Sequence, residues 1–399
     1  MKSILFYKES TRQKLNKLIL HLLEENSLFK NIIGNTQDFC ECYERLPYVD
    51  KNFILSHNDY YTNKVNKKIV KEFTSGSTGK PFECVKTNEE RMKMALEIWK
   101  ERKKIDNKIN SNNFCELIGL NAYKSGIDFT CMTDENFTRI VDYIDNRQPR
   151  WICLSATMAY YYSKKMQENK IRFSSIKFIE VQGECLEPEK RQFIEQIFEA
   201  KVIVQYGLRE CWAIAYECES GKLHLMDDTY LIEIDKTNNE YNNEYGELVI
   251  SSCIYECMPI IKYRTGDLCK ATKIEKCKCG KEKTIVLDLL GGRTANLIKG
   301  YDGMIADIVF KRILRYSIRD VALMPLNIDS FCVIQKKINE FYYEICVKDV
   351  SSERRIELEK ALISHTKKIL GENVVINIIY TKQPKTSNNG KIKFYTSEC

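Results

Sequence analysis

The stretch Phe73-Thr74-Ser75-Gly76-Ser77-Thr78-Gly79-Lys80-Pro81 joins a β-type run at residues 68–73 to a helical run at about 88–103. It contains hydroxyl side chains, two glycines and a lysine within eight residues. Glycines let backbone N–H groups approach an anion closely, hydroxyls add donors, and lysine adds positive charge. The stretch therefore predicts a phosphate-binding loop, with a plain turn as the alternative. It is not an ATPase P-loop, because Lys80 is followed by Pro81.

The overall composition points to a two-domain protein of the cytosol. With 399 residues, the chain is long enough for two unequal domains. The net charge of +7 arises from 62 basic and 55 acidic residues without a long block of one sign, which argues against a nucleic-acid partner. Residues 1–23 mix charged and apolar residues at helical spacing, so we expect neither a signal peptide nor a membrane span. The 17 scattered cysteines indicate reduced thiols and a cytoplasmic location.

Residues 114–206 alternate between short apolar runs and amphipathic runs. This alternation predicts a largely parallel sheet covered by helices. Ligands bind at the carboxyl ends of such strands, where Gly183-Glu184 and Tyr206-Gly207 lie. The predicted strands are residues 114–120, 151–154, 176–181 and 202–205, and helices are expected at 11–28, 133–143 and 187–198.

The chain becomes β-rich after residue 222, with short alternating strands and Asn, Gly or Glu turns. A boundary follows at Leu290-Gly291-Gly292-Arg293-Thr294. We therefore expect an α/β protein with a large domain at 1–292, including a β-rich subdomain at about 222–290, and a small, mobile α+β domain at 293–399. The strands expected here are 223–226, 230–234, 246–251, 260–263, 330–335, 341–348 and 374–380, and the helices are 306–316 and 352–370.

Five motifs occur in a fixed order along the chain. They are residues 74–81, Tyr206-Gly207-Leu208-Arg209-Glu210, Tyr263-Arg264-Thr265-Gly266-Asp267, Gly292-Arg293-Thr294, and the polar turn from Pro384 to Lys391. This ordered set closely resembles the adenylate-forming (AMP-binding) enzymes. Within them it resembles the branch of phenylacetate–CoA ligase, coenzyme F390 synthetase and CapK-type proteins. The resemblance spans roughly residues 45–395.

The resemblance implies a role for each matching residue. Glu210 would hold Mg²⁺, Asp267 would accept hydrogen bonds from the ribose hydroxyls, and Lys391 would stabilise charge at the substrate carboxylate and α-phosphate. Arg209 would lie beside the phosphates. The remaining residues implied in nucleotide binding are Thr74, Ser75, Gly76, Ser77, Thr78, Gly79, Lys80, Gly183, Glu184, Tyr206, Gly207 and Arg293.

Without the resemblance, simpler interpretations stay open for three of these residues. Glu210 would fit an exposed acid at a helix start, Asp267 a turn residue after glycine, and Lys391 a solvated lysine in a polar tail. Each motif is weak alone, and the order of all five is what distinguishes the two interpretations.

The chain also departs from the family pattern. Arg209 stands where the family usually has threonine before the metal-binding glutamate, and a guanidinium there can strengthen anion binding or crowd the metal. Ala295 and Asn296 replace the acids of the hinge motif. The small domain of this family rotates between two half-reactions. The chain is therefore expected either to rotate less tightly or to use an acceptor other than coenzyme A.

A second metal is suggested by Cys218, His224, Cys277 and Cys279. Three thiolates and one imidazole form the ligand set of a closed structural zinc site. Relatives of the resembled branch have the same pattern. Cys253, Cys257 and Cys269 lie nearby in the sequence and stay open as substitutes.

The resemblance implies an ATP- and Mg²⁺-dependent enzyme that converts a small carboxylic acid, with an aryl acid as first choice, to an acyl-adenylate. The acyl group then passes to a thiol, either coenzyme A or a carrier-protein phosphopantetheine. One alternative ends in an amide, with an amine acceptor. Another is a nucleotide-binding scaffold without catalysis. The oligomeric state stays open, with a homodimer as one choice.

Overall fold

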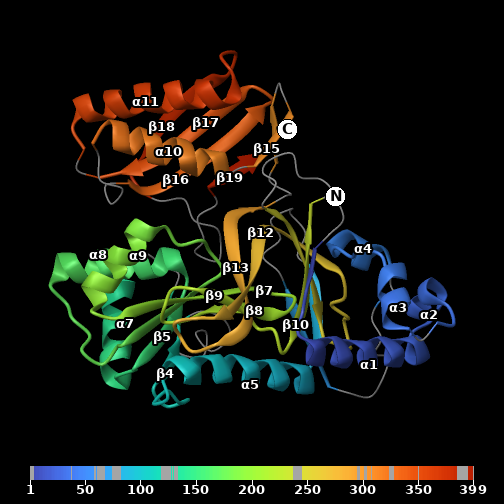
Figure 1. The fold of residues 1–399 in the computed structure, drawn as a ribbon. Helices are drawn as coiled ribbons and strands as arrows, with labels where there is room; N and C mark the ends of the chain where they lie inside the picture. The colour runs from blue at the N-terminus through green and yellow to red at the C-terminus, as the bar shows by residue number, and fades with distance from the viewer. Residues whose placement is uncertain are drawn as a thin grey trace. The chain divides into compact units, whose positions relative to one another are not determined.

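The computed structural model describes residues 4–36, 38–57, 60, 68–73, 82–117, 127, 129, 134–236, 245–293, 297–300, 303–306, 308–322, 328–348, 350–383 and 394–398. The chain divides into two units, and each contains two separate segments of the sequence. Figure 1 shows the helices and strands coloured along the chain. Unit 1 comprises residues 1–109 and 203–290, and unit 2 comprises residues 110–202 and 291–399. The predicted phosphate loop at 74–81, the hinge positions 295 and 296, and Lys391 all lie outside the described residues.

Unit 1 is built on a sheet in which β10 pairs antiparallel with β11, β11 with β12, β7 with β8, and β8 with β9. Its central strands place Ile232, Leu248 and Ile250 in the core with no exposed surface. The strands, in spatial order, are β1 (Ile4–Phe6), β10 (Tyr230–Asp235), β11 (Gly246–Ser252), β12 (Tyr263–Lys276), β13 (Glu282–Arg293), β9 (Leu223–Leu225), β8 (Trp212–Glu217) and β7 (Lys201–Leu208).

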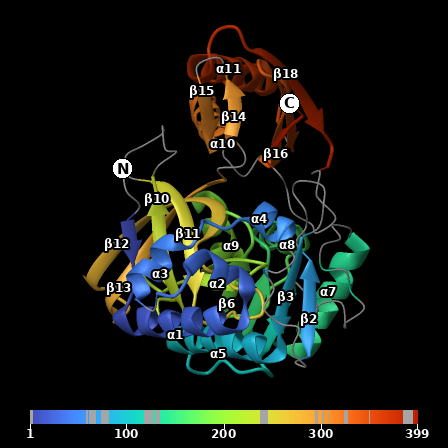
Figure 2. The same ribbon diagram turned by 90° about the vertical axis from the view of Figure 1, so that its right-hand side faces the viewer.

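Helices and a separate two-stranded ribbon complete unit 1. Strand β2 (Ile69–Phe73) pairs antiparallel with β3 (Glu83–Thr87), and Figure 2 shows the two side by side. This ribbon flanks residues 74–81 on both sides in the sequence. The helices are α1 (Glu9–Glu25), α2 (Ser27–Ile33), α3 (Phe39–Arg45), α4 (Lys51–Ser56) and α5 (Asn88–Ile105).

The start of α5 is fixed by one carboxylate that serves two parts of the chain. Thr87 and Glu90 form a capping box, in which each side chain accepts a hydrogen bond from the other residue's backbone N–H. Glu90 is buried, and its second oxygen accepts hydrogen bonds from the backbone N–H groups of Glu256 at 2.6 Å and Cys257 at 2.8 Å. Glu90 therefore joins the two sequence segments of unit 1.

The first segment of unit 2 contains the predicted alternation of strands and helices. Strands β4 (Phe114–Glu116), β5 (Trp151–Leu154) and β6 (Phe178–Gln182) pair in parallel. Trp151, Ile152, Ile179 and Val181 are almost completely buried, as expected for parallel strands with helices on their faces. The helices are α7 (Asp134–Arg147), α8 (Ala156–Asn169) and α9 (Pro188–Phe198).

The second segment of unit 2 is an α+β structure around its own core. Helices α10 (Ile308–Asp320) and α11 (Ser352–Leu370) contribute Phe310, Leu358 and Leu362, which pack against Val333 and Tyr343 of the strands. The four-stranded sheet has the order β18 (Val375–Thr381), β17 (Glu340–Val347), β16 (Ile328–Lys337), β19 (Tyr395–Ser397), and β14 (Leu297–Gly300) pairs with β15 (Gly303–Ala306).

The predicted fold class is confirmed, with corrections in detail. The parallel arrangement holds for β4, β5 and β6, whereas β7 continues into the antiparallel hairpin with β8. The short strand expected at 260–263 was wrong, because Tyr263 begins a strand of 14 residues. The domain boundary between residues 292 and 293 stays a prediction. Among the described helices, none has the length and hydropathy that a bilayer-spanning segment needs.

Candidate functional site

A tight turn between β7 and β8 presents Arg209 and Glu210. Strand β7 pairs with β8 so that Gly207 lies opposite Ala213 and Leu208 opposite Trp212. A Cβ atom on Gly207 would lie 1.7 Å from the backbone oxygen of Trp212, so only glycine fits there. Trp212 itself adopts a left-handed backbone conformation, with φ of 61°. The backbone at this hairpin tip is therefore closely constrained.

Glu210 is buried in this turn and lies between two donors. Only 2% of the residue is exposed. The Lys51 ammonium lies 2.9 Å from Oε1, and the Tyr263 hydroxyl donates to the same oxygen at 3.0 Å. Burial, and then the negative charge of Glu210, raises the pKa of Tyr263 well above its usual value, so the phenol stays a donor. The simpler interpretation of Glu210 as an exposed helix-start acid is therefore wrong.

A buried ion pair between Lys86 and Glu72 joins the β2–β3 ribbon to this turn. The fully buried Lys86 of β3 donates to the backbone oxygen of Arg209 at 2.9 Å and lies 3.1 Å from the Glu72 carboxylate. The Trp212 indole N–H donates to Glu72 Oε2 at 3.0 Å. Burial opposes the ionisation of Glu72, but Lys86 and Trp212 together hold its pKa below the usual value. The ribbon that flanks residues 74–81 is thus attached to the Glu210 turn.

Two residues implied in nucleotide binding also meet in unit 1. The Tyr206 hydroxyl donates to Asp267 Oδ2 at 2.7 Å. Burial, followed by the charge of Asp267, raises the pKa of Tyr206 well above its usual value. Asp267 lies within β12, directly after Gly266 with φ of 75°, so it is not a residue of a simple turn. The structure therefore places Tyr206 and Asp267 together, at the opposite end of β7 from Lys201.

Other predicted residues are placed elsewhere or not described. Gly183 follows β6 with φ of 79°, and Glu184 Oε2 accepts a hydrogen bond from the backbone of Thr157 at 2.8 Å, at the start of α8. Both belong to unit 2. Arg293 ends β13.

Sequence reasoning missed Lys51, Glu72 and Lys86. Lys86 lies 123 positions before Arg209, whose backbone oxygen it contacts. Lys51 is separated from its partner Glu210 by a still longer stretch of sequence. The only signal was a lysine placed among apolar and thiol side chains in the strand Glu83–Thr87. Tyr263 was quoted as part of a motif, but its contact with Glu210 was not expected.

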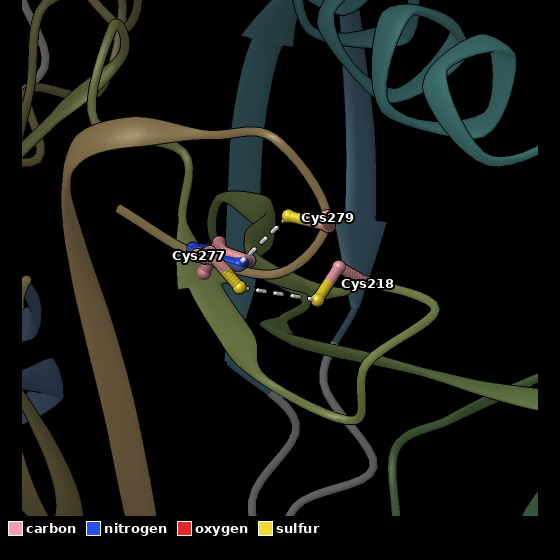
Figure 3. A group of neighbouring side chains, drawn as sticks. Cys218, Cys277 and Cys279 are labelled. Atoms are coloured by element: carbon pink, nitrogen blue, oxygen red, sulfur yellow. Dashed lines mark hydrogen bonds between the residues drawn. The ribbon is translucent and has the colours of Figure 1, made fainter.

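The four predicted metal-ligating residues converge at the far end of β8. Cys218 follows β8, His224 lies in β9, and Cys277 and Cys279 form the turn between β12 and β13. Their ligand atoms all lie within 4.8 Å of one another. Cys218 Sγ is 4.0 Å from Cys277 Sγ, and Cys279 Sγ is 3.5 Å from His224 Nε2 (Figure 3). Cys253, Cys257 and Cys269 lie outside this group.

The surroundings of the cluster fit a zinc ion. His224 is fully buried, and its Nδ1 lies 3.3 Å from the Thr284 hydroxyl, which leaves Nε2 directed at Cys279. Burial, with a smaller contribution from Lys281, lowers the pKa of His224 to about 4. A neutral imidazole is the form that binds a metal. Lys281 is itself held by Glu101 of α5 at 2.8 Å.

Comparisons with known proteins agree with this architecture. Residues 69–254 match the sequence model of the family described as AMP-binding enzyme. 2-Hydroxyisobutyryl-CoA ligase, solved in the postadenylation state in complex with R3-HIB-AMP, is similar over 97% of this chain and 89% of its own, with 13% identity and a TM-score of 0.75. No curated protein matches the chain.

Two further solved structures differ in their named reaction. The anthranilate CoA ligase AuaEII has a TM-score of 0.56 and 12% identity, over 81% of this chain and 65% of its own. The amide bond synthetase McbA from Marinactinospora thermotolerans has a TM-score of 0.54 and 14% identity, over 80% of this chain and 66% of its own. The predicted resemblance to adenylate-forming enzymes is confirmed at the level of the fold and the AMP-binding domain, and the branch stays a prediction.

Proposed function

From an AMP-binding domain at residues 69–254, set in the fold of the acyl-adenylate-forming ligases, we propose that the chain activates a small carboxylic acid with ATP. The products of this step are an acyl-adenylate and pyrophosphate. The observation that carries the proposal is this match, because it spans both the 74–81 loop and the Glu210 turn.

Each candidate site residue has a proposed role that its side-chain chemistry suits. Glu210, buried at a hairpin tip, would hold Mg²⁺, which supplies charge neutralisation at the triphosphate. Asp267 would bind the ribose hydroxyls, and its contact with the Tyr206 hydroxyl orients the carboxylate for this task. The loop at 74–81 would bind the phosphates with backbone N–H groups, hydroxyls and Lys80. Lys391, from the small domain at 293–399, would stabilise charge in the first half-reaction.

The acceptor and the acid belong to the proposal as well. We favour transfer to a thiol, either coenzyme A or a carrier-protein phosphopantetheine, and an aryl acid as substrate. Coenzyme A ligases and an amide bond synthetase share the fold, so an amine acceptor is the second candidate. The replacement of the hinge acids by Ala295 and Asn296 favours this second candidate, because thioester formation in this family needs the domain rotation.

A structural zinc ion and a cytoplasmic location complete the proposal. Cys218, His224, Cys277 and Cys279 would hold zinc, and the ion would fix the β12–β13 turn to β8 and β9. The location follows from the odd, scattered set of 17 cysteines.

Pyrophosphate release tests the central proposal. The wild-type protein is assayed with ATP, Mg²⁺ and a panel of aryl and aliphatic acids, with hydroxylamine to trap the acyl group. We expect release that depends on one class of acid and collapses in Lys391→Ala. ATP binding without release for every acid would favour the scaffold alternative. Adding coenzyme A or amines to the active acid then identifies the acceptor.

A further inference from the structure

Lys51 is placed by features that are independent of Glu210. It is the first residue of α4, whose start is capped by Asp50 accepting a hydrogen bond from the Phe53 backbone at 2.7 Å. Just before it, Val49 donates to the Lys262 backbone oxygen at 2.9 Å and accepts from the Arg264 N–H at 2.8 Å. The segment that presents Lys51 is therefore bonded directly to the strand start that presents Tyr263.

The two partners of Glu210 occupy the same oxygen. Lys51 and Tyr263 both contact Oε1, at 2.9 and 3.0 Å. A carboxylate whose side chain is only 3% exposed needs a compensating positive charge, and the ammonium supplies it. The Lys51 ammonium can move away from Glu210 into solvent when a metal ion binds, because the Lys51 side chain is 40% exposed.

Lys51 also lies close to a residue that directly follows 74–81 in the sequence. Its ammonium is 6.0 Å from the ring centre of Phe82, the first described residue after 74–81. A divalent cation bound at Glu210 would meet this ammonium as a like charge.

We propose that Lys51 is the resident counter-ion of Glu210, and that a divalent metal ion must compete with its ammonium for the carboxylate. This inference rests on the proposed role of Glu210 as the metal ligand. Lys51 is a positioning residue: its ammonium balances the charge of Glu210 and orients the carboxylate through Oε1. Its charge weakens the binding of metal alone, so that the site fills together with the negatively charged nucleotide.

Metal binding without nucleotide tests this inference. The probe is Mn²⁺ alone, titrated by calorimetry into the full-length wild type, Lys51→Met, Lys51→Arg and Glu210→Gln. We expect Lys51→Met to bind Mn²⁺ about fivefold more tightly, the size of an ion pair worth about 1 kcal/mol. Lys51→Arg keeps the charge and should bind as the wild type does. Lys93→Met, which removes an exposed lysine of α5 paired with Glu89, is the matched control and should leave binding unchanged.

The outcomes separate this inference from the proposed function. Unchanged or weaker Mn²⁺ binding in Lys51→Met, with binding lost in Glu210→Gln, overturns the role of Lys51 and leaves Glu210 as the ligand. Wild-type Mn²⁺ binding in Glu210→Gln overturns the metal role itself. Tighter binding in both Lys51→Met and Lys51→Arg would also count against a charge effect. The half-saturating Mg²⁺ concentration for pyrophosphate release provides the second readout, which a loss of stability alone does not shift.

Discussion

The Glu210 turn and the Cys/His cluster lie at opposite ends of β8, and they differ in whether their charged or metal-binding groups already have strong partners. At the turn, Glu210 already has Lys51 and Tyr263 as partners, and Glu72 already has Lys86. At the cluster, thiols and an imidazole face one another across 3.5 to 4.0 Å, distances at which they bind each other weakly. The first arrangement suits a metal ion that binds reversibly, and the second suits a permanently bound structural metal ion.

The comparison is most strongly tested at Lys86. Replacing Lys86 with Met leaves the Glu72 carboxylate buried, with Arg91 at 3.6 Å as an ion-pair partner and Arg209 as a further positive charge nearby. We expect a loss of about 3–5 kcal/mol in the free energy of unfolding, measured by denaturant titration. Lys71→Met removes an exposed pair with Glu83 on the same ribbon and serves as the control. A stability equal to that of the control would mean that the charges behind the turn are not needed.

A second test removes the proposed metal ligand. Glu210→Gln keeps the size of the side chain and its hydrogen bond from Tyr263 but loses the charge. We expect acid-dependent pyrophosphate release to fall about a hundredfold, equivalent to about 2.7 kcal/mol in the barrier. A rate within a factor of three of wild type would contradict the role of Glu210.

A third test removes the metal ion proposed for the Cys/His cluster. We expect purified protein to contain zinc without any being added, and Cys277→Ser to lose it. If free zinc stands at about a hundred times its dissociation constant, chelation should lower the free energy of unfolding by about 2.7 kcal/mol. Protein purified without bound zinc would rule out the zinc proposal, whatever its activity.

The smallest expected effect concerns the pH dependence of the chelated protein. Burial lowers the pKa of His224 to about 4, below its unfolded value of about 6.5. Unfolding therefore takes up a proton between these values, and the stability from the neutral imidazole is lost as pH falls from 6.5 to 4. We expect the free energy of unfolding to decrease across this range, and His224→Gln should abolish the decrease.

Local patterns in the sequence were sufficient for many elements of the fold. Strand Trp151–Leu154 and helix Ser352–Leu370 have the predicted bounds, because each has a clear apolar pattern and a clear break at both ends. The four residues of the cluster were also named from the sequence, where the family resemblance supported a Cys-x-Cys signal that is weak alone. These four residues lie at strand ends that pairing brings together.

The remaining features depend on contacts between distant parts of the chain. The long β12–β13 hairpin was missed because its outer half carries exposed lysines and glutamates on both faces, so it shows no apolar stripe. Strand β8 was missed because its residues directly follow the motif at 206–210, where the preceding strand was expected to end. The pairs Lys51–Glu210 and Lys86–Glu72 have no local pattern, since a buried lysine is specified only by the carboxylate opposite it.

The position of Glu90 bears on how the chain is synthesised. Its carboxylate caps α5 locally, but its second oxygen binds backbone that the ribosome adds 166 residues later. The packing of unit 1 therefore cannot be completed until residues 203–290 have been synthesised, after residues 110–202 of unit 2. Such nonlocal closure slows folding and prolongs the exposure of apolar surface in the nascent chain. A ribosome-bound chain that ends before residue 256 would have a capped α5 without its final docking partner.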